Sequence, residues 1–250
     1  MHTTDTTHST GLDHAEAMAL QATELERTIT LLESLDDDDW GAQTECPAWD
    51  VHHMYLHVLG ACEASVTIRE NLHQMRAARA HQKRNGGPLE AGLSAVQVAE
   101  REHLSPAQTL ERLREVAPRT VAKRTSLPGL LRNGISVQID GPVVERWKLG
   151  YLIDTIYLRD LWMHRVDASR ATGRDLVLTP EHDGRIIADV AAEWARRHGR
   201  PVTLELTGPV GGTFTQGDGG EHLSLDAVEF CRTVGGRSDG SGLLATIVPF

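Results

Sequence analysis

The most informative hydrophobic pattern lies in the second half of the chain. Leu149, Ile153 and Ile156 recur there at three- and four-residue steps, which is the spacing of one face of an α-helix. Together with the helix-forming residues around them, they predict a single helix from about Val143 to Arg170 with its apolar face turned inward.

Ionisable side chains continue this inward face. Beyond Ile156 the face meets Asp160, then His164, then Asp167. Burying an ionisable group is costly unless another group pairs with it or a metal ion binds it. Asp160 and His164 stand at positions i and i+4, so both side chains can face one ion. This spacing leads to the hypothesis that the pair binds a metal ion with a third ligand from another helix.

The third ligand is expected on the helix that starts after Asp50 and runs to about Lys83. Asp50 is a good N-cap residue, and three histidines follow it. His57 lies beside the apolar stripe of this helix and can reach a neighbouring helix. His52 and His53 fall in the first turn, where exposure is expected. His57 is therefore the predicted ligand and His53 its alternative.

Two imidazoles and one carboxylate suit zinc and other first-row divalent ions. Three protein ligands leave one coordination position open, as in catalytic sites. Asp167, one turn beyond His164, could then orient an imidazole. Without a metal, Asp160 would pair with Arg159 or Arg165. His164 would then be a hydrogen-bonded histidine of the core.

The remaining patterns predict a helical region followed by a mixed one. Helical periodicity and end signals predict further helices over residues 12–35, 93–103, 105–124 and 179–199, with an irregular loop over 128–142. Later residues predict strands over 201–207 and 211–217, a helix over 225–234, and a strand or apolar tail over 243–250. We therefore expect a flexible tail (residues 1–12), a metal-binding helical bundle (13–175) and a small α+β domain (176–250).

Composition narrows the classes of partner. The chain has 250 residues, of which 40% are hydrophobic, and its formal net charge of -10 argues against nucleic acid. No segment approaches the roughly 18 apolar residues of a membrane span, and the polar N-terminus lacks the apolar core of a signal peptide. Cys46, Cys62 and Cys231 are odd in number and widely spaced, which favours free thiols in a reducing compartment. We expect a cytoplasmic monomer or small homo-oligomer.

Three stretches of the chain carry longer motifs. They are residues 46–57 (CPAWDVHHMYLH), 160–167 (DLWMHRVD) and 229–237 (EFCRTVGGR). The first resembles the start of the second helix in the mycothiol-dependent maleylpyruvate isomerase family, the second the fourth-helix motif of that family, and the third its C-terminal signature. The resemblance spans nearly the whole chain in the family's order. It implies an α+β fold: a DinB-like four-helix bundle followed by a small α+β C-terminal domain.

The resemblance also implies a set of functional residues. Members of the family bind a divalent metal, usually zinc, through a histidine of helix two and an acid-xxx-histidine pair of helix four. The matching positions are His57, Asp160 and His164, although the acid is commonly Glu in the family and is the shorter Asp here. Arg237 matches the arginine of the terminal Gly-Arg pair. The resemblance implies that Arg237 approaches the site and binds a carboxylate of the substrate or of the thiol cofactor.

The implied activity is that of a metal-dependent enzyme with mycothiol as cosubstrate. A thiol that coordinates a divalent ion becomes a thiolate, which can add to a small electrophilic substrate. The thiol leaves again in an isomerase, whereas a transferase retains the S-conjugate, and the sequence leaves both outcomes open. Two alternatives are a metal-dependent hydrolase that activates water and a non-catalytic module that holds a metal or small ligand for regulation or stress response.

Overall fold

The computed structural model describes residues 3–5, 11–139 and 144–250. These residues divide into two compact units. One unit is His14–Asp175, and the other is Leu176–Phe250 together with Met1–Asp13.

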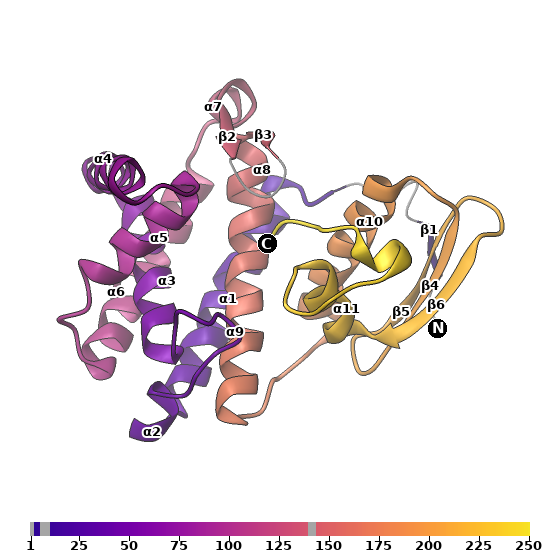
Figure 1. The fold of residues 1–250 in the computed structure, drawn as a ribbon, viewed down its shortest axis with the longest axis horizontal. Helices are drawn as coiled ribbons and strands as arrows, with labels where there is room; N and C mark the ends of the chain where they lie inside the picture. The colour runs from indigo at the N-terminus through magenta and orange to yellow at the C-terminus, as the bar shows by residue number, and fades with distance from the viewer. Residues whose placement is uncertain (1–2, 6–10, 140–143) are drawn as a thin grey trace. The chain divides into compact units, whose positions relative to one another are not determined.

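The unit His14–Asp175 is built around a four-helix bundle of α1, α6, α3 and α9 (Figure 1). One leucine from each of these helices, namely Leu25, Leu113, Leu59 and Leu161, joins the same hydrophobic core. Burial of such side chains contributes about 1.5–3 kcal/mol each relative to exposure. The helices of the unit are α1 (His14–Glu33), α2 (Asp37–Trp40), α3 (Val51–Val66), α4 (Ile68–Asn85), α5 (Leu89–Ala99), α6 (Pro106–Thr125), α7 (Gly129–Gly134), α8 (Leu149–Tyr151) and α9 (Tyr157–Thr172).

Several predicted ends are confirmed, but the single helix predicted from Asp50 to Lys83 is wrong. Ser105 caps α6 in the expected capping box with Gln108. The chain breaks at Thr67, where φ is -132° and ψ is 138°, and separate helices α3 and α4 lie on either side. The Thr67 hydroxyl accepts a hydrogen bond from the backbone N–H of Glu70. The side chain thus caps a new helix, which competes with continuing the old one.

The region between α6 and α9 also differs from the prediction. The expected loop contains α7 and strand β2 (Ser136–Ile139), which pairs antiparallel with β3 (Glu145–Lys148). The predicted start of the key helix at Val143 lies outside the described residues. The helix itself begins only at Leu149. The missed signal is the alternation of apolar and polar residues in β2, which is typical of a strand.

A π-helical turn, η2 (Leu152–Ile156), connects α8 to α9. Such a turn inserts one residue into the helical repeat and changes the direction of the side chains that follow. Gln21 of α1 donates a hydrogen bond to the Ile153 carbonyl oxygen at 2.6 Å, which satisfies a backbone group within this turn. Ile153 and Ile156 are buried as predicted.

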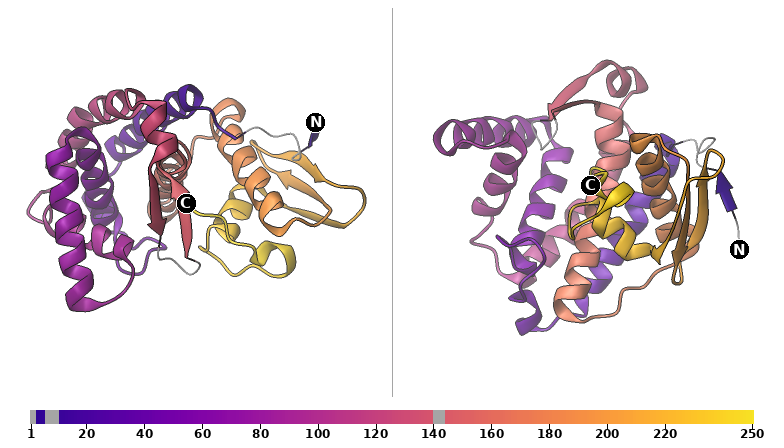
Figure 2. Two further views of the ribbon diagram at one scale, coloured as in Figure 1. Left: turned by 90° about the horizontal axis from the view of Figure 1, so that it is seen from above. Right: turned by 45° about the vertical axis from the view of Figure 1, so that its right-hand side comes forward.

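The second unit is a small sheet with two helices packed on one face (Figures 1 and 2). The strands lie in the order β1-β5-β4-β6, with β4 antiparallel to β5 and parallel to β6. The rings of Trp194 and Phe230 join the two helices, with centroids 5.3 Å apart. The elements are β1 (Thr3–Asp5), η3 (Pro180–Gly184), α10 (Arg185–His198), β4 (Val202–Thr207), β5 (Gly212–Gln216), β6 (Glu221–Asp226), α11 (Ala227–Val234) and η4 (Gly242–Ala245).

Two strands of this sheet were not predicted. Strand β6 covers residues 221–224, for which no element was predicted, and its last two residues lie at the predicted start of the helix over 225–234. Strand β1 lies in the predicted tail and pairs in parallel with β5, so the tail prediction is wrong for Thr3–Asp5. Residues 1–2 and 6–10 of the tail lie outside the described residues. The α+β fold class, with a helical bundle before a small α+β domain, is confirmed.

The structure also bears on membrane insertion. In the described parts of the chain, we find no helix with both the length and the apolar character that a membrane crossing requires.

Candidate metal centre

The first turn of α3 determines which of its histidines already have partners. The Asp50 carboxylate caps the helix by accepting a hydrogen bond from the backbone N–H of His53, and it contacts the Nδ1 atom of the same residue at 2.7 Å. The Nε2 atom of His52 lies 3.1 Å from the hydroxyl oxygen of Thr109. Both histidines are therefore held by neighbours within the helical unit. His57, one turn beyond His53, is left to face α9.

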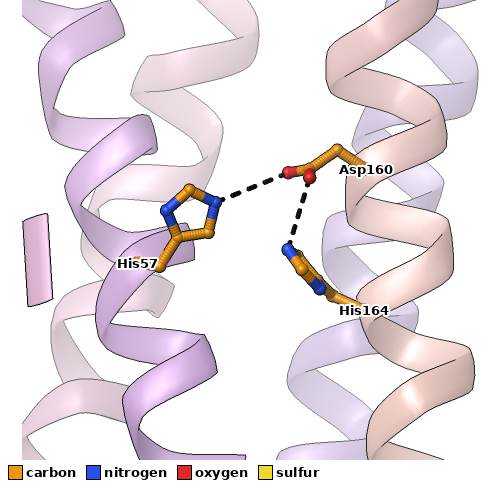
Figure 3. A group of neighbouring side chains, drawn as sticks. All are labelled: His57, Asp160 and His164. Atoms are coloured by element: carbon orange, nitrogen blue, oxygen red, sulfur yellow. Dashed lines mark ion pairs between the residues drawn. The ribbon is translucent and has the colours of Figure 1, made fainter. Parts of the chain in front are cut away.

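His57 and the two ionisable residues of α9 point toward one another (Figure 3). The Nε2 atom of His57 lies 3.9 Å from Oδ2 of Asp160, and the Nε2 atom of His164 lies 3.3 Å from Oδ1 of Asp160. The two imidazole rings are 5.5 Å apart and nearly perpendicular. One ligand atom from each residue can be chosen so that all three lie within 4.8 Å of one another. We call these three residues the triad.

Three of the four ring nitrogens of the triad lack hydrogen bonds to the described residues. Nδ1 of His57 and both nitrogens of His164 are buried and have no hydrogen-bond partner among the described residues. The carboxylate oxygen 3.3 Å from His164 is close, but it does not meet the geometry of a hydrogen bond. Buried polar atoms are nearly always paired, so these nitrogens require an explanation such as a bound ion or water.

The charges of the triad depend strongly on one another. Burial favours the neutral acid of Asp160, but the adjacent imidazoles of His164 and His57 outweigh it and hold the pKa of this carboxyl group well below its usual value. Burial likewise favours the neutral ring of His164, yet Asp160 and then Asp167 outweigh it and raise the pKa of this histidine to about 9. In the absence of a metal, a proton on His164 therefore takes the place of a cation beside Asp160.

A tryptophan lies against the two imidazoles. The Trp49 ring stacks on His57 with centroids 5.1 Å apart and an interplanar angle of 25°. The same ring meets His164 edge-on at 6.4 Å. An indole here restricts the motion of both rings and displaces water. Trp49 could not be assigned to the site from sequence, because its position depends on the turn before α3.

A match to a known protein family spans the three residues of the triad. The family model described as the mycothiol maleylpyruvate isomerase N-terminal domain matches residues 21–169, which is more than half of the chain. The chain belongs to this family. A comparison with curated protein sequences found no match.

Two solved structures share the fold over nearly the full length. A crystal structure of the mycothiol-dependent maleylpyruvate isomerase has a TM-score of 0.58 and 17% identity, and the match covers 95% of this chain and 94% of that one. A histidine-to-alanine mutant of such an isomerase has a TM-score of 0.58 and 16% identity, with 94% and 92% covered. At this identity the likeness establishes a shared fold.

In the alternative without a metal, Asp160 was expected to pair with Arg159 or Arg165. Arg165 pairs with Glu24 at 2.6 Å rather than with Asp160, whose ion pairs are with His57 and His164. The carboxylate of Asp167, fully buried, lies 3.7 Å from Nδ1 of His164. This distance is too long for a hydrogen bond, but it places a negative charge behind the ring.

Arg237 lies in the other unit, after α11. Its backbone N–H donates a hydrogen bond to the Arg232 carbonyl at 2.8 Å, and the preceding Gly236 has a φ of 81°. A positive φ is unfavourable for residues with a Cβ atom, so the glycine enables the turn that ends the helix. The predicted role of Arg237 in catalysis and cofactor binding stays a prediction.

None of the three cysteines forms a disulfide bond, as the sequence predicted. Cys62 and Cys231 are buried, and Cys46 is half-buried. Burial raises the pKa of the Cys62 thiol, which makes its reactive thiolate form scarcer. The structure thus offers no reason to treat Cys62 as a nucleophile.

Proposed function

We propose that His57, Asp160 and His164 hold a divalent metal ion, with zinc as the expected ion. The observation that carries this proposal is the convergence of two imidazoles and a carboxylate whose buried ring nitrogens have no hydrogen-bond partner among the described residues. Two nitrogens and one oxygen are a donor set typical of zinc. Ligand atoms of one tetrahedral zinc lie about 3.3–3.5 Å apart, as follows from bond lengths near 2.0–2.1 Å, so small side-chain movements would close the triad around an ion.

A set of three protein ligands leaves room for an external one. A divalent ion bound there would supply Lewis-acid chemistry, since a coordinating thiol loses its proton and becomes a nucleophilic thiolate. The residues around the triad would orient that thiol by holding the imidazole ligands in place. The Trp49 ring restricts the two imidazoles, and Asp167 stabilises the ring of His164 from behind.

The proposed reaction is addition of the mycothiol sulfur to a small electrophile. Membership of a family named for a mycothiol isomerase supports mycothiol as the thiol. If the thiol leaves after addition, the enzyme is an isomerase, and if the adduct persists, it is an S-transferase. Arg237 is proposed to bind a carboxylate of the substrate or of mycothiol, because a guanidinium forms paired hydrogen bonds with carboxylates.

The proposal is tested by metal analysis followed by thiol titration of the cobalt-loaded protein. We expect close to one metal ion per chain and a sulfur-to-cobalt charge-transfer band on addition of mycothiol. A full complement of metal without this band would favour the hydrolase alternative. Absence of stoichiometric metal would contradict the proposal and favour the non-catalytic module. A panel of electrophiles, followed by mass spectrometry, then separates an isomer from an S-conjugate.

A further inference from the structure

The polar face of α9 continues past the triad to Tyr157. Tyr157 precedes Asp160 by three residues and His164 by seven, and both intervals bring side chains to nearly the same face of a helix. At 1.5 Å per residue, Tyr157 stands roughly 4.5 Å and 10 Å along the helix axis from these two residues. That is the span of a small organic molecule.

The hydroxyl group of Tyr157 is available to a ligand. The residue is only half-buried, and no described residue forms a hydrogen bond with its hydroxyl. Tyr55 of the same bundle is different, because it is fully buried and its hydroxyl donates to the His164 carbonyl oxygen at 3.4 Å. A tyrosine hydroxyl usually finds a partner when its ring is buried. In the described structure Tyr157 therefore has a donor to spare.

Arg124 of α6 holds the Tyr157 ring in place. Its guanidinium carbon lies 4.2 Å from the centre of the ring, which is a cation–π contact. Its Nη1 donates to Gln21 at 2.7 Å, and its Nε and Nη2 both donate to the hydroxyl oxygen of Ser65 at 3.1 and 3.0 Å. Arg124 thereby joins three other segments of the bundle, so the ring has little freedom to move.

The guanidinium of Arg124 forms no ion pair with a carboxylate among the described residues, although the charge of the Asp160 carboxylate acts on it from the triad. Its side chain is buried at 5% exposure, and its hydrogen-bond acceptors, Gln21 and Ser65, are both neutral. A buried charge is normally compensated by an opposite charge. A metal ion held by Asp160 would offset the charge of that carboxylate, and the positive potential of Arg124 would then favour an anionic group near the Tyr157 ring. A divalent ion at the triad would add to this potential.

The protonation state of Tyr157 fits a donor. Burial raises the pKa of its hydroxyl above the ordinary value, although the charge of Arg124 opposes this. The hydroxyl therefore keeps its proton at neutral pH.

We propose that Tyr157 is a substrate-contacting residue that donates a hydrogen bond to an oxygen atom of an anionic electrophile, and that Arg124 is its positioning residue. This inference rests on the proposed function, because the electrophile must lie beside the triad. The acceptor is a carboxylate oxygen of a small organic acid. The triad and Tyr157 then contact opposite ends of one ligand.

The experiment compares wild type, Tyr157→Phe and Tyr151→Phe as full-length, cobalt-loaded proteins. Tyr151→Phe is the matched control, because it also removes a hydroxyl from a half-buried tyrosine of the same helical segment. The probe is maleate, titrated by calorimetry in the presence of mycothiol. We expect Tyr157→Phe to weaken maleate binding about tenfold or more, which is the effect of losing one hydrogen bond to a charged group. Tyr151→Phe is expected to bind as wild type does.

Metal content, melting temperature and the thiol-to-cobalt band serve as independent readouts. All three should remain at wild-type values in Tyr157→Phe. If the hydroxyl had a merely structural role, weaker maleate binding would be accompanied by a change in at least one of them. Equal maleate affinity in Tyr157→Phe and wild type, or no maleate binding by wild type, would overturn the inference while the thiol band still upheld the proposed function. Absence of metal or of the band in wild type would instead refute the proposed function.

Arg124→Lys tests the positioning role separately. Lysine keeps the charge but cannot hold both Ser65 and Gln21 in the same fork, so maleate affinity should fall with the band unchanged. If Arg124→Lys does not fold, the Tyr157→Phe comparison still decides the inference. If it folds and binds maleate as wild type does, Arg124 has no positioning role.

Discussion

Two carboxylates six residues apart, Asp154 and Asp160, both have a histidine neighbour, but their surroundings differ. Asp154 lies 2.7 Å from Nδ1 of His14 and accepts a hydrogen bond from Nη1 of Arg132 at 3.0 Å. The second nitrogen of His14 lies 3.1 Å from the Thr125 carbonyl oxygen. Both oxygens of the acid and both nitrogens of the imidazole thus have partners within the protein.

The Asp160 cluster is not closed in this way. Its histidines approach the carboxylate at 3.3 and 3.9 Å, and three of their four ring nitrogens are buried without hydrogen bonds to any described residue. A carboxylate beside a histidine is therefore not by itself a sign of metal binding in this protein. The distinguishing feature is unused bonding capacity, which the Asp154 cluster lacks.

The largest expected effect is loss of metal from the triad variants. His57→Ala and His164→Ala each remove one of three proposed ligands, and we expect metal content to fall from about one ion per chain to near zero, with an affinity loss above roughly a hundredfold. The helical circular dichroism spectrum should persist. His14→Ala is the matched control and should retain the metal, because its nitrogens already have partners.

Retention of metal by His57→Ala would contradict this comparison. His53 would then replace His57 as the ligand of α3, and the double variant would test it. The Asp50 contact of His53 argues against that outcome, since the ring would have to leave its partner.

The next effect is on stability and belongs to the closed cluster. Asp154→Ala leaves the charge of Arg132, with its side chain only 19% exposed, without its carboxylate partner. We expect the free energy of unfolding to fall by about 2–3 kcal/mol, somewhat below the range for fully buried pairs because both side chains keep some solvent contact. Urea unfolding with chelator present measures this loss. Metal content should be unchanged, and a simultaneous loss of metal would show that the two clusters are not independent.

A smaller, pH-dependent effect distinguishes the clusters without mutation. The pKa of His164 is about 9 in the folded state and near 6.5 in an unfolded chain, so its proton stabilises the metal-free protein below about pH 6.5. This contribution, on the order of 1–3 kcal/mol, is lost as pH rises through about 9. A metal needs the neutral ring, so stabilisation by zinc should grow over the same range.

Melting curves at pH 6 and pH 8.5, with zinc or with chelator, measure this difference. The shift in melting temperature caused by zinc should be larger at pH 8.5. A shift of the same size at both pH values would argue that His164 is not a ligand. The His164→Ala variant provides the control, because its melting temperature should not respond to zinc at either pH.

The sequence predicted the order of the bundle helices better than their interruptions. Helical periodicity located α1 and α6 of the bundle, and α10 of the other unit, because each carries a regular apolar stripe with clear end signals. Periodicity did not show the break at Thr67, although the run of three β-branched residues Val66, Thr67 and Ile68 disfavours a continuous helix there. It also missed η2, where the carbonyl oxygen of Ile153 accepts a hydrogen bond from Gln21, a residue more than a hundred positions away.

The candidate site shows the same limit. The i, i+4 spacing was enough to suggest Asp160 and His164. The place of His57 beside the apolar stripe of its helix, together with the family resemblance, was enough to prefer it among the three histidines of α3. The stacked ring of Trp49 and the unpartnered nitrogens could not be predicted, because both depend on how the helices pack. A tertiary contact made by a loop tryptophan leaves no periodic signal.

The smallest expected effect concerns the length of the acid. The Asp160 oxygens stand 3.3 and 3.9 Å from the nearest nitrogens of His164 and His57, so the shorter acid already reaches both imidazoles. Asp160→Glu adds one methylene group and keeps the charge. We expect it to retain the metal with less than about a tenfold change in affinity, measured by competition with a chelating dye. Asp160→Ala removes the charge and should lose the metal as the histidine variants do. If Asp160→Glu lost the metal as completely as Asp160→Ala, the position of the ion would depend on the short side chain of Asp160. The site would then differ in geometry from one built around Glu.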